Sequence, residues 1–264
     1  MYSVIIPSIG RVKYLNELLE SINKQSLLPE EIIILLDDNN HCKKLSSSIQ
    51  IEKNYKIIFC KQLNLSEKRN YGALIAKNKY LLFSDDDDIW EIDKGKYTIN
   101  YLKKYPVFCH EYTKFGFYNQ NPKFLLGKQT KLVSFFSLLF GSNIYGGGSN
   151  IAAWREIIIT IPFDKNFSSN EDYDWWIKIF SADIKVLYSP IPLVKYRTHA
   201  NNMTKRIFKI FYFNSKIFNN LLIKSFVFFL TFIFGYLRSI LSLKIKLLKK
   251  IFINLKYSFE HLHK

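Results

Sequence analysis

One stretch of this chain joins an apolar run of strand length, Tyr80–Ser84, to the four consecutive carboxylates of Asp85–Asp88. Four neighbouring carboxylates repel one another, so their presence at the end of a strand is unfavourable unless something offsets the charge. A divalent cation would offset the repulsion, and hard oxygen ligands suit Mg²⁺ or Mn²⁺. The alternative is a solvated acidic turn, which is the usual setting of a charge run. Its place at the end of a buried strand favours the cation, because open α/β sheets bind ligands there.

Apolar runs alternate with amphipathic segments along the first third of the chain. Continuous apolar runs are typical of strands buried on both faces, and they predict strands at 3–7, 32–36, 56–60 and 80–84. Helical spacing of apolar residues predicts helices at 11–25 and 67–76, the second with Ser66 as its N-cap. This alternation predicts an α/β fold in which a mostly parallel sheet is flanked by helices.

The segments beyond residue 92 are less regular, and their elements are predicted individually. A helix is expected at 94–105, one or two strands at 107–117, a loop at 118–134, a short helix at 154–161 and short strands at 185–188 and 193–197. The glycines Gly146–Gly148 indicate either a flexible hinge or a loop that closely approaches another group. Asn170 is a plausible N-cap for a helix that opens with Glu171 and Asp172.

The basic residues are concentrated at the C-terminus. The formal net charge is +16, and residues 205–264 hold twelve of the 38 basic residues but one of the 22 acidic residues. The body of the chain therefore gives no sign of binding nucleic acid. Three widely spaced cysteines and the absence of a signal-peptide pattern indicate a cytosolic protein with reduced thiols.

The C-terminal segment also has a pattern of its own. Phe226–Leu237 has no charge and is flanked by Lys224 and Arg238, but it is too short for a membrane-spanning helix. Short apolar runs framed by cations predict helices that lie in the interface of an anionic membrane. The alternatives are helices that pack on the rest of the chain or on a second subunit, and a basic tail that binds nucleic acid. We therefore predict a domain at 1–204 and a basic amphipathic helical tail at 205–264.

Seven segments of the predicted domain follow one another in a fixed order: Val4–Ser8, Ile32–Asp38, Lys68–Ala73, Phe83–Trp90, Gly147–Ser149, Glu171–Trp176 and Tyr196–His199. In order and spacing they resemble the family 2 glycosyltransferases, inverting enzymes with the Rossmann-like GT-A fold. Each segment alone is a weak signal, but together they are specific for the family, although not for a sugar. The resemblance covers about residues 1–204.

The resemblance implies roles for the residues that match. Those implied to bind the nucleotide are Pro7, Ser8, Asp37, Arg69, Asp85 and Asp86. Asp87 and His199 would hold a Mn²⁺ or Mg²⁺ ion at the diphosphate, and Asp172 would be the catalytic base. The residues implied on the acceptor side are Gly147, Gly148, Glu171, Trp175 and Trp176. Because four Asp are consecutive, Asp86 and Asp88 remain alternatives to Asp85 and Asp87.

Each of these side chains also has a simpler interpretation. Asp37 would also suit an ordinary acidic turn, and Arg69 the surface of a helix. An acid at the position of Asp172 complements the helix dipole without any catalytic role. His199 would also suit the surface, and the paired Trp175 and Trp176 would also suit the core or the wall of a cleft.

The chemistry expected of this set is transfer of a sugar. A departing nucleoside diphosphate needs a cation to stabilise its charge, and an acceptor hydroxyl needs a carboxylate to take its proton. The Gln-x-x-Arg-Trp motif of processive synthases is absent, and Asn39-Asn40 and Ser8-Ile9-Gly10 depart from the usual family residues. We expect an inverting, non-processive enzyme that uses a nucleotide-diphosphate sugar, with UDP as the expected nucleotide.

The setting expected from the resemblance and the tail is the cytoplasmic face of a bacterial membrane. The acceptor would be a glycan or a lipid-linked precursor of a surface polysaccharide such as lipooligosaccharide, capsule or O-chain. The alternative hypothesis is a membrane-associated scaffold that keeps the fold without activity.

Overall fold

The computed structural model describes residues 1–117, 119–121, 128–133, 145–167 and 171–199. The predicted tail and the predicted N-cap Asn170 lie outside these residues, and so does part of the predicted loop at 118–134. Within the described part of that range, residues 131–133 form a short strand rather than loop. Among the described helices, none is both long enough and apolar enough to cross a membrane.

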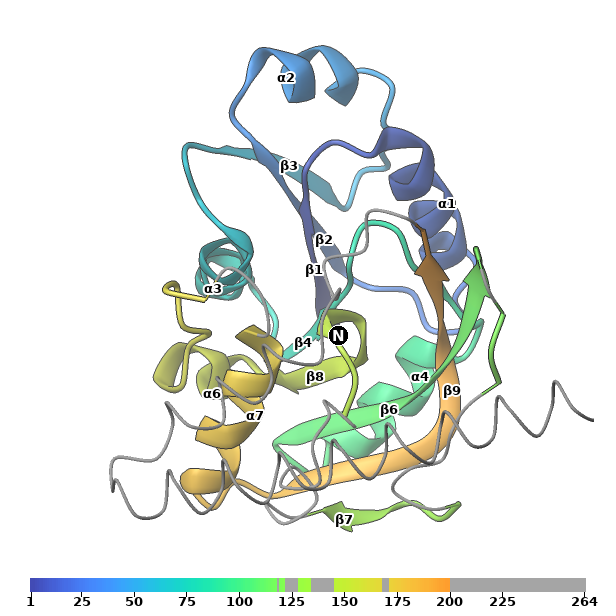
Figure 1. The fold of residues 1–264 in the computed structure, drawn as a ribbon, viewed down its shortest axis with the longest axis vertical. Helices are drawn as coiled ribbons and strands as arrows, with labels where there is room; N and C mark the ends of the chain where they lie inside the picture. Colours follow the sequence, from blue (N-terminus) through green and yellow to red (C-terminus); the bar gives the residue numbers. More distant parts are fainter. Residues whose placement is uncertain (118, 122–127, 134–144, 168–170, 200–264) are drawn as a thin grey trace, which may run out of the picture. The chain divides into compact units, whose positions relative to one another are not determined.

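Strands and helices alternate along the first part of the chain, as predicted. The elements are β1 (Tyr2–Ser8), α1 (Val12–Asn23), β2 (Glu31–Asp37), α2 (Asn40–Ser46), β3 (Tyr55–Cys60), α3 (Leu65–Ile75) and β4 (Tyr80–Phe83). The four strands pair in parallel in the order β3-β2-β1-β4. Their C-terminal ends therefore lie at one edge of the sheet (Figure 1).

The second half of the sheet is mixed. Its elements are β5 (Ile89–Trp90), α4 (Lys94–Leu102), β6 (Val107–Gly116), β7 (Lys131–Val133), the 3-10 turn η1 (Gly148–Asn150), β8 (Ile151–Trp154), α6 (Arg155–Thr160), α7 (Glu171–Ser181) and β9 (Val186–Thr198). Strand β8 is antiparallel to both β4 and β6, whereas β6 and β9 are parallel. The predicted α/β class, a central sheet flanked by helices, is confirmed.

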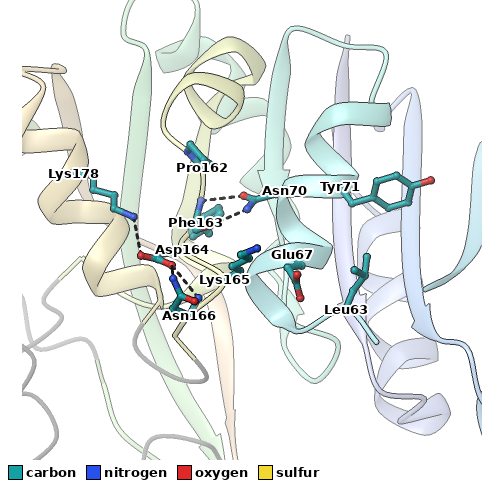
Figure 2. Close-up of a pocket in the computed structure, with 10 residues that line it drawn as sticks. All are labelled: Leu63, Glu67, Asn70, Tyr71, Pro162, Phe163, Asp164, Lys165, Asn166 and Lys178. Carbon is teal, nitrogen blue, oxygen red and sulfur yellow. Dashed lines mark hydrogen bonds and ion pairs between the residues drawn. The ribbon is translucent and has the colours of Figure 1, made fainter. Parts of the chain in front are cut away.

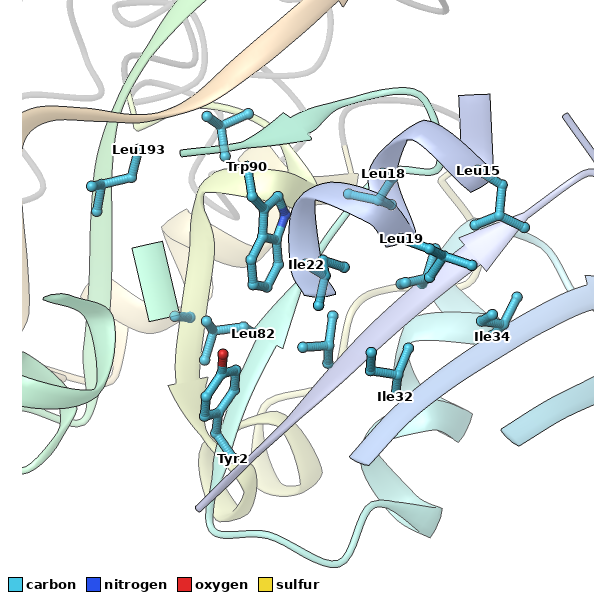
Figure 3. Close-up of a cluster of buried hydrophobic side chains, with 14 of the residues drawn as sticks. Tyr2, Leu15, Leu18, Leu19, Ile22, Ile32, Ile34, Leu82, Trp90 and Leu193 are labelled. Atoms are coloured by element: carbon cyan, nitrogen blue, oxygen red, sulfur yellow. The ribbon is translucent and has the colours of Figure 1, made fainter. Parts of the chain in front are cut away.

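Alternate residues of the buried strands face two different helix layers. Ile32 and Ile34 of β2 pack with Leu15 and Leu18 of α1 in the main hydrophobic cluster (Figure 3). On the other face, α3 approaches β1 so closely that a Cβ at Gly72 would lie 2.5 Å from Cγ2 of Ile5. This double burial is why these strands are continuous apolar runs.

The structure differs from the local predictions in two further places and adds one helix that was not predicted, each for an identifiable reason. Helix α3 is capped by Asn64, not by Ser66: Asn64 and Glu67 form a reciprocal capping box. The short helix α2 was missed, although Asn39 is its N-cap and accepts a hydrogen bond from the Cys42 amide. The segments predicted as two short strands form the single strand β9, and shifts in its register with β6 accommodate the prolines at 190 and 192.

Candidate functional site

The acidic loop after β4 lies beside the C-terminal ends of β1 and β2. Pro7 and Ser8 end β1, and the Ser8 hydroxyl donates a 2.5 Å hydrogen bond to Oδ2 of Asp86. Lys68 of α3 links the neighbouring strand ends, because its ammonium donates to the Ser8 carbonyl at 2.8 Å and to Asp37 at 2.5 Å. The residues predicted to bind the nucleotide on β1, on β2 and in the acidic loop are thus brought together.

The two predicted metal ligands are neighbours. Oδ2 of Asp87 lies 2.8 Å from Nε2 of His199, the residue that follows β9. The same oxygen lies 2.6 Å from Nη1 of Arg11, which stands at the start of α1. Arg11 also donates from Nε to Asp86 at 2.9 Å. Two carboxylates, an imidazole and a guanidinium therefore meet at this point.

Asp87 and His199 could supply two ligands to a divalent cation, of which the carboxylate is the kind that Mg²⁺ and Mn²⁺ prefer. In the described residues, no group of three or more His, Cys, Asp or Glu side chains is arranged to hold a metal ion. Mg²⁺ commonly takes one or two carboxylates and completes its shell with waters and substrate phosphates. In this structure the Asp87 carboxylate is paired with the Arg11 guanidinium.

Arg69 is a buried cation that connects α3, the acidic loop and α7. Its Nη1 donates to Glu171 at 2.5 Å, and its Nη2 donates to Asp85 at 2.8 Å. Burial alone would lower the pKa of Arg69, but the charges of Glu171 and Asp85 outweigh it and raise that pKa. Glu171, predicted on the acceptor side, is itself buried and is committed to this ion pair.

The two predicted glycines lie between the acidic loop and α7. A Cβ at Gly148 would lie 2.1 Å from Nη2 of Arg69 and 2.7 Å from Oδ1 of Asp85. A Cβ at Gly147 would lie 3.6 Å from Oδ2 of Asp172 and 3.9 Å from Oδ2 of Asp85. Close approach therefore explains Gly148, whereas a Cβ at Gly147 would make only ordinary contacts. The carboxylates of Asp172 and Asp85 are thus both close to Gly147.

Asp172 is the second residue of α7, and the pKa of its carboxyl is higher than that of an ordinary aspartate. Burial, with a further contribution from the Glu171 charge, raises the pKa of Asp172 to about 8, even though Arg69 opposes the shift. A carboxyl that takes up and releases a proton near neutral pH is suited to general base catalysis.

Arg197 fixes the end of β9 against the acidic loop. Its backbone amide donates to Oδ1 of Asp88 at 3.0 Å, and its Nε donates to the Asp87 carbonyl at 2.8 Å. The guanidinium lies 4.4 Å from the ring centroid of Tyr14 and 4.6 Å from that of Phe115. These contacts hold the strand end that carries His199, so Arg197 positions the predicted metal ligand.

The two tryptophans predicted on the acceptor side lie in the core instead. Trp175 and Trp176 both have an exposed fraction of 0%. The Trp175 ring stacks on Phe163 at 5.3 Å, and the Trp176 ring contacts Tyr145 at 5.2 Å. The prediction was wrong because both indoles face inward from α7, where they support the helix that presents Asp172.

Sequence reasoning missed Arg11, Lys68 and Arg197 as residues of this site. Arg11 had a detectable signal, because a cation at a helix N-terminus opposes the helix dipole and needs another partner. Lys68 and Arg197 lie inside matched segments, but residue type and spacing do not show which carboxylate or carbonyl each one contacts.

A separate pocket of about 470 Å³ lies on the outer side of α3. Figure 2 shows two contacts in its lining, one between Asn70 of α3 and Phe163 and one between Lys178 of α7 and Asp164. Asn70 both donates to and accepts from the backbone of Phe163, at 2.8 and 3.0 Å. None of the predicted site residues lines this pocket, whose hydrogen bonds tie the segment before α7 to α3.

The two glycines give a matched pair of variants. Gly148→Ala places a methyl group against the buried Arg69–Asp85 pair, so we expect a loss of about 1–3 kcal/mol in the free energy of unfolding. We also expect weaker nucleotide binding. Gly147→Ala makes only ordinary contacts and should keep the stability of the unmodified protein. Urea unfolding of both variants measures the difference, and equal stabilities would contradict this packing.

Comparisons with known proteins agree with the geometry. A family model for glycosyl transferase family 2 matches residues 3–146. The amylovoran biosynthesis glycosyltransferase AmsB of Erwinia amylovora is 26% identical over 209 residues, which cover 74% of this chain and 69% of AmsB. The UDP-Glc:alpha-D-GlcNAc-diphosphoundecaprenol beta-1,3-glucosyltransferase WfaP of Escherichia coli is 26% identical over 234 residues, covering 85% of this chain and 88% of WfaP.

A solved structure shares the fold. The crystal structure of S. aureus TarS in complex with UDP-GlcNAc matches with a TM-score of 0.66 and 17% identity, covering 86% of this chain and 70% of the TarS chain. Because the family match spans more than half of its 264 residues, this chain belongs to glycosyl transferase family 2.

Proposed function

We propose that this protein is an inverting, non-processive glycosyltransferase that moves one sugar from a UDP-sugar to a glycan or lipid-linked acceptor. One observation carries the proposal: a Cβ at Gly147 would lie 3.6 Å from Oδ2 of Asp172 and 3.9 Å from Oδ2 of Asp85. The Asp172 carboxylate is therefore close to the acidic loop. Direct displacement would need a base within reach of the same anomeric carbon whose diphosphate the acidic loop binds, and Asp172 would be that base.

Each side of the site has a distinct task in the reaction. Asp87 and His199 would hold Mn²⁺ or Mg²⁺, which supplies charge neutralisation for the departing diphosphate. Ser8, Asp37 and Asp85 would bind the nucleotide. The acceptor oxygen forms a bond to the anomeric carbon while the bond from that carbon to the diphosphate oxygen breaks. The acceptor proton passes to Asp172, and the nucleoside diphosphate leaves with the bonding electrons.

The relatives support a role in bacterial surface polysaccharide synthesis. AmsB is named for amylovoran biosynthesis, and WfaP is named for transfer of glucose from UDP-Glc to a GlcNAc-diphosphoundecaprenol acceptor. A lipid-linked acceptor of this kind lies at the membrane surface. The predicted basic tail would hold the enzyme there, at the cytoplasmic face, through anionic headgroups.

A donor panel tests the proposal. Release of nucleoside diphosphate is measured for UDP-, GDP- and dTDP-sugars with Mn²⁺, with Mg²⁺ and with EDTA, in the presence of diphosphoundecaprenol-linked saccharides. We expect release from at least one UDP-sugar, dependent on the divalent cation. An inactive scaffold would instead bind none of these nucleotides in calorimetry, which would refute the proposal.

The raised pKa of Asp172 predicts the pH dependence of catalysis. A base must be deprotonated, so kcat/KM should fall as pH decreases through about 8, by about tenfold per pH unit well below that value. An ordinary aspartate would give a constant rate above about pH 5. The profile is measured between pH 6 and 9, with melting temperatures over the same range to exclude unfolding. A flat profile would contradict the assigned role.

A further inference from the structure

Arg11 makes more contacts to the acidic loop than any role at the start of α1 requires. It donates to Asp86 from Nε at 2.9 Å and also from Nη2, and its Nη1 lies 2.6 Å from Oδ2 of Asp87. The same Nη1 is 3.1 Å from Nε2 of His199. Its side chain makes no capping hydrogen bond, and its charge at a helix N-terminus is unfavourable. The contacts of the Arg11 side chain are therefore made to the acidic loop and not to the helix that it precedes.

The position of Nη1 coincides with the predicted cation site. Asp87 Oδ2 and His199 Nε2 lie 2.8 Å apart, and Nη1 contacts both of them. A guanidinium and a divalent cation that share one carboxylate oxygen repel each other, and the repulsion is strong where water is largely excluded. Arg11 therefore has to leave Asp87 when a divalent cation enters.

Arg11 has room to move, whereas its partners do not. Its side chain is 31% exposed, compared with 1% for Asp86 and 7% for Asp87. The Arg11 guanidinium already lies among Asp86, Asp87 and His199, so a diphosphate bound at these residues would be within its reach. Its planar fork of donors matches two phosphate oxygens.

We propose that Arg11 is a switching cation of the donor site. Without a donor it neutralises Asp86 and Asp87 and opposes binding of a divalent cation. With a donor it releases Asp87 and donates to the diphosphate, so that the divalent cation and the nucleotide bind together. This inference rests on the proposed function, because it requires a nucleotide-diphosphate ligand.

The proposal predicts effects of opposite sign on two ligands when the charge is removed. Arg11→Met keeps the length of the side chain and removes its guanidinium. Mn²⁺ alone, measured by calorimetry or by the paramagnetic resonance of free Mn²⁺, should bind about tenfold more tightly to Arg11→Met. UDP in the presence of saturating Mn²⁺ should bind roughly tenfold to a hundredfold more weakly.

A control variant with the same change in net charge separates the specific effect of removing the Arg11 guanidinium from a general effect of net charge. Lys13 is an exposed residue of α1 two positions away, and Lys13→Met should change neither affinity. Arg11→Lys keeps the charge without the fork, so it should leave Mn²⁺ binding near that of the unmodified protein and still weaken UDP. Melting temperatures of all three variants verify that they are folded.

The outcomes distinguish this inference from the function on which it rests. If Arg11→Met weakens both ligands or leaves the Mn²⁺ affinity unchanged while the unmodified protein binds UDP, the switching role is wrong and the proposed function stands. If the unmodified protein binds no UDP with Mn²⁺ present, the proposed function is wrong and the inference falls with it.

Discussion

Asp172→Asn is expected to reduce turnover by about 10²- to 10⁴-fold while the protein remains folded and binds UDP normally. The asparagine side chain cannot take the proton of the acceptor hydroxyl, but it has nearly the same size as aspartate. It also keeps an oxygen that can accept the hydrogen bond that the backbone N–H of Tyr173 donates to Oδ1 of Asp172 at 2.9 Å. Nucleoside diphosphate release under saturating donor measures the loss. Turnover within about threefold of the unmodified enzyme would contradict the role of Asp172 as base.

The same variant should be as stable as the unmodified protein or more stable. The unfolded chain loses the Asp172 proton near pH 4, whereas the folded protein keeps it up to about pH 8. Between these values the stability contributed by this carboxyl falls as pH rises, and the neutral amide avoids that loss. Asp174→Asn is the matched control one residue beyond Tyr173: Asp174 pairs with Lys178 at 2.8 Å and should be dispensable for turnover.

Arg69→Met is expected to lower the free energy of unfolding by about 3–5 kcal/mol. The change leaves Asp85 and Glu171 without the cation that now contacts both at 2.8 and 2.5 Å. It should also abolish nucleotide binding, because Asp85 loses the partner that orients it. Urea unfolding followed by tryptophan fluorescence measures the stability, and a loss below about 1 kcal/mol would contradict a buried, coupled ion network.

Two further variants show whether the loss arises from unpaired charge. Adding Glu171→Gln to Arg69→Met removes one of the stranded carboxylates, so the double variant should recover part of the lost stability. Lys24→Met removes one partner of the solvent-exposed Lys24–Glu20 pair and should have no measurable effect. A double variant less stable than Arg69→Met would exclude unpaired charge as the cause.

Much of the parallel half of the sheet could be predicted from the sequence, because burial on both faces leaves runs such as Ile32–Leu36 without polar residues. The C-terminal ends of those strands then had to meet, which brought Asp37 and Asp86 into one site. The local boundaries were harder, since both Ser66 and Asn64 are competent caps and the capping box with Glu67 decides between them.

The parts of the site that escaped prediction depend on side-chain direction. The direction in which Trp175 and Trp176 point depends on how α7 is rotated about its axis, and the sequence motif does not specify that rotation. Arg11 reaches the acidic loop from a helix start 75 residues away in sequence; its place at a helix N-terminus indicates that it needs a partner, but not which carboxylates that partner would be. The sequence therefore indicated which residue types meet, whereas the structure shows which partner each one has.

The proposed mechanism is direct displacement with Asp172 as the catalytic base. Proton NMR of the first turnovers with the donor found by the panel tests it, because the coupling constant of the anomeric proton reports the configuration of the product. Direct displacement predicts a product whose anomeric configuration is opposite to that of the donor sugar. A product with the configuration of the donor would contradict the account, since it would require a covalent or front-face route that this site was not proposed to perform.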